Sequence, residues 1–229
     1  PVSVEEWIDA VPVLLVTWYP GGEGGLALAD LVFGDASPSG RLPYTWGRKL
    51  EDWPCHSMGE SLAWPGLLTD AKGERLPKPF QARQYYHDGI WVGYRGFDRY
   101  GRQPRWPFGF GLSYTTFAIA PAQADPDALR YAVKVRNTGA RPGRQVVQCY
   151  VSKPESEGQE MPAKELAAFK SVTLAPGEER LVTFDLRPDD FRYWSEAAGA
   201  WRIPQAPCAV LIGDSAANLP VRHEARPHK

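Results

Sequence analysis

The sequence has few cysteines, and their spacing excludes two classes of protein. Cys55, Cys149 and Cys208 are the only three in 229 residues. Three thiols at this spacing form neither a disulfide framework nor a zinc site. We expect buried free thiols, although the sequence leaves a Cys149–Cys208 bridge open. No motif predicts a cofactor, and we expect no metal site.

The chain also lacks a long apolar run, an excess of charge and a leader. No apolar run approaches the roughly 20 residues that span a bilayer, so we expect no membrane contact. The net charge of −1 argues against nucleic acid or an anionic membrane as the main partner. No signal peptide is visible, but the chain begins at Pro1, as a fragment or a processed chain would. Location therefore stays open among secreted, periplasmic and cytoplasmic.

The composition is otherwise that of a globular protein, with 43% hydrophobic and 23% charged residues. The length suffices for one large or two ordinary domains. Nine tryptophans and ten tyrosines are many for this length. Packing in a core is the commoner use of such rings, and stacking on sugars is the alternative.

The first part of the chain has an α/β pattern. Val13–Trp18 is apolar and β-prone, which predicts a strand buried on both faces of a parallel sheet. Residues 26–33 predict a helix with Leu28, Leu31 and Val32 facing inward, and Gly34 stands where a helix-ending glycine belongs. Residues 47–83 lack periodicity, and such a long connection is functional or lies against another domain.

A glycine loop, residues 19–25, lies between the predicted strand and helix, where α/β sheets bind ligands. It has neither the GxGxxG spacing nor a P-loop lysine, and Glu23 would repel a phosphate. Glu23 is therefore a candidate for binding a sugar hydroxyl. The alternative is that the glycines only permit a tight turn.

The junction segment, Pro104–Phe117 (PRWPFGFGLSYTTF), separates two architectures. Its prolines disfavour a helix, and Gly109 and Gly111 permit positive φ. After it, the alternation of Leu129–Val135 begins about seven predicted strands. We expect a bulge between Phe169 and Val172 and a β-sandwich of immunoglobulin or fibronectin type. The predicted boundary lies between residues 113 and 114.

Several motifs carry a resemblance to a known family. The junction segment resembles PxFPFGxGLSYTxF of the β-glucosidases of glycoside hydrolase family three, and Trp18–Gly25 resembles their WYPGQEGG. Asp88–Asp98 resembles EGIFVGYRYFD, and Asn137–Gly139 and Lys164–Leu166 resemble motifs of the family's fibronectin type III-like domain. The resemblance implies a partial α/β sandwich over residues 1–113, followed by a fibronectin type III-like β-sandwich over residues 114–229.

The resemblance also implies an activity. It is that of a retaining exo-β-glycosidase, most specifically a β-glucosidase, which removes terminal non-reducing β-linked glucose from β-glucosides or cello-oligosaccharides. In the family the nucleophile lies on a preceding barrel, and the acid/base lies earlier in the α/β sandwich. We therefore expect no catalytic residue here, an inactive isolated chain, and the upstream barrel and α/β-sandwich half as partners.

Three residues are candidates for the rim of the substrate site: Glu23, Asp88 and Trp91. The family usually has Glu where this chain has Asp88, so its carboxylate is one methylene shorter. The alternatives are an aspartate in a surface turn and a ring that packs in a short strand. Arg95 is expected to pair with Asp98 or with the barrel. For the whole chain, the alternative is a non-catalytic carbohydrate-binding or scaffold module.

Overall fold

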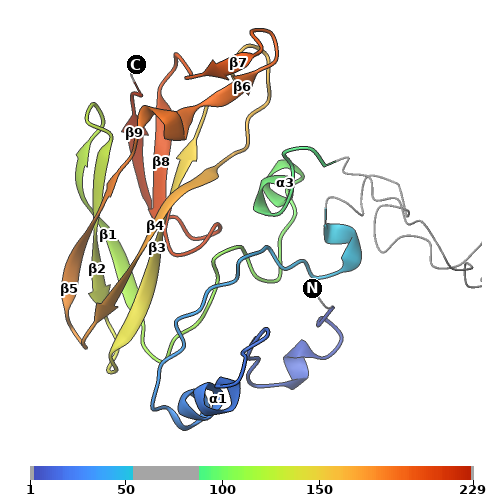
Figure 1. The fold of residues 1–229 in the computed structure, drawn as a ribbon, viewed down its shortest axis with the longest axis vertical. Coiled ribbons are helices and arrows are strands. Elements are labelled where there is room, and N and C mark those ends of the chain that lie inside the picture. The colour runs from blue at the N-terminus through green and yellow to red at the C-terminus, as the bar shows by residue number, and fades with distance from the viewer. Residues whose placement is uncertain (1–2, 54–87, 228–229) are drawn as a thin grey trace, which may run out of the picture.

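The computed structural model describes residues 3–53 and 88–227. Most of the predicted loop at 47–83 lies outside the described residues, and so does Cys55. Figure 1 shows a β-sandwich built from the second half of the chain. Short helices and extended segments of the first half lie beside it.

The β-sandwich consists of two antiparallel sheets. The smaller sheet has the order β1-β2-β5 and the larger has the order β4-β3-β8-β9. A further hairpin, β6-β7, extends from one end (Figure 1). The strands are β1 (Phe117–Asp125), β2 (Arg130–Asn137), β3 (Gly143–Ser152), β4 (Glu165–Leu174), β5 (Glu179–Asp185), β6 (Tyr193–Ser195), β7 (Ala200–Arg202), β8 (Cys208–Gly213) and β9 (Val221–Ala225).

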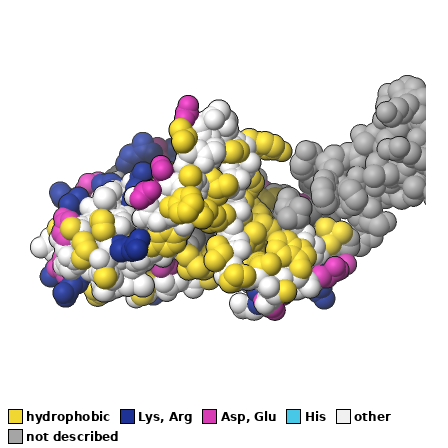
Figure 2. All heavy atoms as spheres, turned by 90° about the horizontal axis from the view of Figure 1, so that it is seen from below, with side chains coloured by type: hydrophobic (Ala, Val, Ile, Leu, Met, Phe, Trp, Pro, Cys, Tyr) yellow, Lys and Arg dark blue, Asp and Glu magenta, His cyan; other side chains and the backbone are white. Residues whose placement is uncertain are grey.

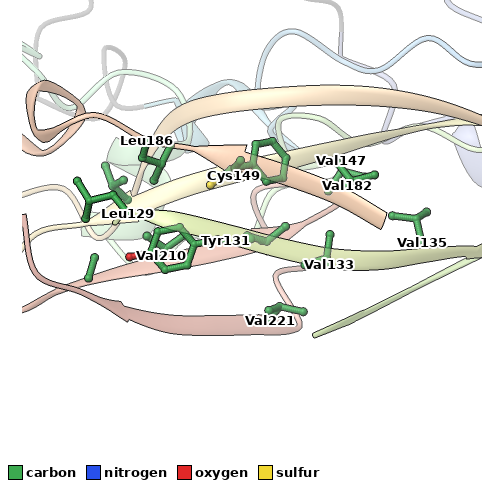
Figure 3. Close-up of a cluster of buried hydrophobic side chains, with 14 of the residues drawn as sticks. Leu129, Tyr131, Val133, Val135, Val147, Cys149, Val182, Leu186, Val210 and Val221 are labelled. Carbon is green, nitrogen blue, oxygen red and sulfur yellow. The ribbon is translucent and has the colours of Figure 1, made fainter. Parts of the chain in front are cut away.

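The core lies between the two sheets, as Figure 3 shows. Tyr131, Val133 and Val135 on β2 have no exposed surface, whereas Lys134 between them is exposed. This confirms the period-two prediction, which rests on the alternation of side chains across a strand. Figure 3 places Val147 and Val210 of the other sheet opposite these residues.

Cys149 and Cys208 are free and buried, which answers the question of a bridge between them. They lie on neighbouring strands, but the register pairs Cys149 with Ile212. Burial raises the pKa of the Cys149 thiol to about 12 and that of Cys208 to about 11. Both thiols therefore stay protonated and pack as small apolar side chains.

The predicted bulge lies elsewhere in β4. The register between β3 and β4 shifts where Cys149 pairs with Ala168 and Tyr150 pairs with Leu166, so Ala167 has no opposite residue. The prediction of a bulge between Phe169 and Val172 was wrong. The last residues of β4 alternate regularly between exposed and buried, but residues 165–168 are all half-buried, since α3 contacts this end of the strand.

The described residues of the first half form few regular elements. A 3₁₀ helix, η1 (Ile8–Ala10), precedes the apolar run, and α1 (Gly24–Phe33) follows it. Gly34 ends α1 with φ +83°, as the sequence predicts. No residue of α1 is buried, however, so the expectation that its leucines face inward is not met.

The run Val13–Trp18 does not form the predicted strand. Val13 is 68% exposed and Trp18 is 57% exposed, and neither belongs to a sheet within the described residues. A strand of a parallel sheet needs neighbouring strands to satisfy its backbone and to cover its faces. The described residues provide none, so the run forms no regular element. Figure 2 shows hydrophobic side chains gathered on the side of the molecule that carries α1.

The junction segment is bonded through its main chain to residues of both halves. On the sandwich side, the Ala216 N–H after β8 donates to the Phe108 carbonyl at 2.9 Å. Trp46 and Trp106 form a β-bridge, and the Leu42 N–H donates to the Phe110 carbonyl at 2.9 Å. The Gly109 N–H donates to the Leu42 carbonyl at 2.8 Å. Gly109 has φ +83°, and a Cβ there would lie 2.1 Å from the Gln148 amide. The sequence places a glycine at 109 because no larger residue fits.

Candidate rim site

Two of the three candidate residues lie in one turn before α3 (Tyr94–Arg99). The Trp91 N–H donates to the Asp88 carbonyl at 2.9 Å, which closes the turn. Gly89 has φ +55° and Gly93 has φ +56°, a conformation that favours glycine. These two glycines hold Asp88 and Trp91 in the same short loop, immediately before the helix.

Both side chains of this turn are partly buried. The Oδ1 oxygen of Asp88 is shielded from solvent, although the residue lies in a turn. The guanidinium carbon of Arg99 lies 4.1 Å from the centre of the Trp91 ring. This is a cation–π geometry. The alternative of rings that pack in a short strand does not hold, because Trp91 lies in the turn and Tyr94 begins α3.

Arg95 pairs with a partner that the sequence did not predict. Its Nη2 lies 3.0 Å from the Glu165 Oε1 on β4. Asp98 instead accepts a hydrogen bond from the Lys164 Nζ at 2.5 Å. Arg95 and Asp98 therefore do not pair as expected, and each contacts a residue of the sandwich instead. Nothing in the local spacing of α3 indicates partners some 70 residues away in the chain.

Tyr94 adds polar and aromatic contacts between α3 and the sandwich. Its hydroxyl accepts a hydrogen bond from the Leu166 N–H at 3.0 Å. Its ring meets the Tyr150 ring edge-on, with centres 5.7 Å apart. Burial, with smaller contributions from Tyr94 and Asp98, raises the pKa of Tyr150 well above its ordinary value. The Tyr150 hydroxyl stays protonated and donates to the Gln148 Oε1 at 2.6 Å.

Glu23 lies on a different element. It directly precedes α1, and its exposed side chain makes no capping hydrogen bond to that helix. Figure 1 shows α1 and α3 at separate places beside the sandwich. The structure thus brings Asp88 and Trp91 together and leaves Glu23 apart from them.

The described residues contain no other strong candidate for a site. Among residues 3–53 and 88–227, no three His, Cys, Asp or Glu side chains form a group that could hold a metal ion. Two shallow hollows lie at the β8–β9 side of the sandwich, and neither is lined by Glu23, Asp88 or Trp91. No helix in the described part of the chain has the length and apolar character to cross a membrane.

The comparison with protein families decides where the chain belongs. The model of the glycosyl hydrolase family 3 C-terminal domain matches residues 1–114, and that of a fibronectin type III-like domain matches residues 145–216. The chain belongs to glycosyl hydrolase family 3. The expected fold class, a partial α/β sandwich followed by a fibronectin type III-like β-sandwich, is confirmed. The boundary at residues 113 and 114 stays a prediction.

Family 3 relatives cover almost all of this chain. Beta-glucosidase BoGH3A of Bacteroides ovatus is 36% identical over 219 residues, which are 93% of this chain and 27% of that protein. A beta-glucosidase of Rhizobium radiobacter is 36% identical over 96% of this chain and 27% of its own length. The chain thus spans about a quarter of the length of these two family 3 relatives.

Solved structures of family 3 β-glucosidases have the same fold. The Kluyveromyces marxianus enzyme in complex with glucose matches with a TM-score of 0.84 and 33% identity, over 100% of this chain and 26% of that one. The Bifidobacterium adolescentis enzyme matches with a TM-score of 0.81 and 33% identity, over 98% of this chain and 31% of that one. The run Val13–Trp18 and α1 are included in the match to the Kluyveromyces marxianus enzyme.

Proposed function

We propose that this chain is the C-terminal part of a retaining, exo-acting β-glucosidase. The whole enzyme would remove terminal non-reducing β-linked glucose from β-glucosides or cello-oligosaccharides. The observation that carries the proposal is the match to BoGH3A, which extends over 93% of this chain but only 27% of that enzyme. The chain supports the substrate site, and the nucleophile and the acid/base lie in the upstream barrel and α/β-sandwich half.

The exposed apolar surface of the first half supports the proposal that this chain packs against an upstream half. Val13, Trp18 and Phe33 are 68%, 57% and 82% exposed. Covering apolar surface stabilises a protein by about 25 cal/mol per Å². Contiguous exposed apolar side chains therefore favour a partner. The upstream half of the same enzyme is the partner that a family 3 chain of this length would have.

The candidate residues suit a rim better than a catalytic pair. Retaining hydrolysis needs two carboxyl groups about 5 Å apart. Glu23 and Asp88 stand beside α1 and α3, which are separate elements. We assign Asp88 to binding a sugar hydroxyl and Trp91 to stacking on a pyranose ring. Glu23 would line another part of the rim.

A second candidate function is a non-catalytic carbohydrate-binding module. The observation that favours it is a pair of tryptophans on the β6–β7 hairpin. Trp194 and Trp201 are directly opposite each other and are 48% and 62% exposed, with ring centres 5.7 Å apart. Binding of cello-oligosaccharides by the isolated chain, lost on Trp201→Ala, would support this alternative.

Hydrolysis of an aryl β-glucoside tests the main proposal. The isolated chain should show no hydrolysis above background, because it lacks a placed carboxyl pair. The same chain joined to its upstream sequence should hydrolyse the substrate with retention at the anomeric carbon. Activity of the isolated chain after a control for contaminating enzymes would contradict the proposal, and so would an inactive complete protein.

A further inference from the structure

The loop that carries Asp88 and Trp91 is tied to the β-sandwich by the charged side chains of α3. Three ion pairs cross from the helix: Arg95 to Glu165 at 3.0 Å, Asp98 to Lys164 at 2.5 Å and Arg99 to Glu160 at 2.6 Å. With Tyr94, the three helix residues occupy positions i, i+1, i+4 and i+5, which lie on one side of a helix.

The three ion pairs differ in their exposure. The Lys164 and Glu165 side chains are 11% and 20% exposed, and Lys153, which directly follows β3, also pairs with Glu165. In the third pair, Arg99 is 32% exposed and Glu160 is 54% exposed. Exposed ion pairs contribute little to stability, whereas removing one partner of a shielded pair is strongly destabilising. The docking of α3 therefore depends mainly on the first two pairs and on Tyr94.

Arg99 also contacts the ring of Trp91, a candidate rim residue, whereas Lys164 of the second pair lies over the Tyr94 ring at 5.9 Å. The Arg99 guanidinium carbon lies 4.1 Å from the centre of the Trp91 ring while its Nη2 contacts Glu160. A guanidinium is planar and can stack on a ring with its face while its N–H groups donate to a carboxylate. The Glu160 carboxylate therefore holds the Arg99 guanidinium in the position where it lies over the Trp91 indole.

We propose that Glu160, a residue of the sandwich, is a positioning residue for Trp91 and acts through Arg99. This inference rests on the proposed function, in which Trp91 stacks on the sugar ring of a β-glucoside. The sandwich then sets the orientation of an indole at the substrate rim. An indole has no acid or base group, so Glu160 affects the binding of the substrate and not the cleavage of its bond.

Fluorine NMR of the complete enzyme, labelled with 5-fluorotryptophan, tests the positioning step without any need for activity. Trp91→Phe assigns the resonance of Trp91 by its loss. Glu160→Ala should shift or broaden that resonance and leave the others in place. Glu179→Ala is the matched control, because it removes an exposed glutamate of a pair with Lys134 on the far sheet. An unchanged Trp91 resonance in Glu160→Ala overturns the inference.

Kinetics of the complete enzyme test the consequence for substrate. Glu160→Ala should raise KM for an aryl β-glucoside about fivefold, as expected when a cation–π contact is lost, with kcat nearly unchanged. Trp91→Ala should raise KM at least as much, and the double variant should show no further increase. Glu160→Gln should give a smaller effect, because the amide oxygen still accepts a hydrogen bond.

The outcomes separate the two proposals. A complete enzyme that hydrolyses no β-glucoside contradicts the proposed function, and the NMR result still decides whether Glu160 positions Trp91. Independent, additive effects of Glu160→Ala and Trp91→Ala in an active enzyme overturn the inference alone. A fall in kcat with unchanged KM in Glu160→Ala overturns it as well.

Discussion

The two halves of the chain differ in how many of their apolar side chains they bury. Among the described residues, the sandwich buries a cluster of eighteen residues between its sheets, whereas the first half has a cluster of three, Val4, Ile8 and Trp46. The sandwich therefore closes its own core. The first half has the apolar residues of a core, but the residues that the structure describes there provide no second layer to cover them. An apolar pattern in a sequence therefore predicts that a surface will be buried, but it does not predict which segment will cover that surface.

The largest expected effect comes from two phenylalanines, one in each half. Phe184 is 1% exposed and Phe33 is 82% exposed. Phe184→Ala should lower the unfolding free energy of the chain by about 3–5 kcal/mol, because it leaves a cavity in the sandwich core. Phe33→Ala should change it by less than about 0.5 kcal/mol. Chemical denaturation of both variants measures the difference, and equal effects would contradict the comparison.

The junction between the halves should be sensitive at Gly109. Gly109→Ala should cost about 1–3 kcal/mol from overpacking against Gln148, beyond about 1 kcal/mol for a left-handed backbone. Gly158 also has a positive φ, +74°, but nothing lies within 4 Å of its added Cβ. Gly158→Ala should therefore show the backbone cost alone. Thermal melts of the two variants separate the overpacking cost from the backbone cost. Equal losses of stability would show that the backbone conformation accounts for the whole effect at Gly109.

The buried thiols predict a loss of sandwich stability at alkaline pH. Burial raises the pKa of Cys149 from 9.0 to about 12, so only the unfolded chain ionises this thiol between those values. The contribution of this thiol to the unfolding free energy should be constant below pH 8 and should fall above pH 9, by about 1.4 kcal/mol per pH unit. Cys149→Ala should remove this part of the slope. A slope identical to that of the parent chain would contradict the assignment.

The smallest effect is expected for an exposed ion pair within the sandwich. The Lys134 Nζ lies 3.5 Å from the Glu179 Oε1, and the two side chains are 55% and 46% exposed. Lys134→Ala should change the unfolding free energy by less than about 0.5 kcal/mol. Lys164→Ala removes a shielded partner of Asp98 and should cost more. Denaturation at low and high salt would show whether either pair is screened.

Sequence patterns predicted the elements whose signals are local. The alternation of Leu129–Val135 predicted β2, because one face of that strand is buried by its own domain. Gly34 predicted the end of α1 for an equally local reason. The strand β9 (Val221–Ala225) was missed, since its three central residues are polar or charged and only its ends are buried.

Features that depend on distant residues were not predictable. The run Val13–Trp18 is apolar enough for a buried strand, but its strand neighbours are not among the described residues. The partner of Arg95 is Glu165, and no local rule connects the two. Arg99 and Glu160 were missed at the candidate rim for the same reason. Asp88 and Trp91 were found because they share one motif, and their roles stay predictions.

The attachment of α3 has a consequence for exchanging modules between related proteins. The hydrogen bond from the Ala216 N–H to the Phe108 carbonyl joins main-chain atoms of the two halves, so it tolerates divergence in side chains. The bonds of α3 depend on particular charges that both partners must supply. A chimaera cut at residue 114 would leave Arg95 and Asp98 facing foreign side chains. A segment exchanged together with its charge partners would have to begin at Gly93, about twenty residues before the sandwich.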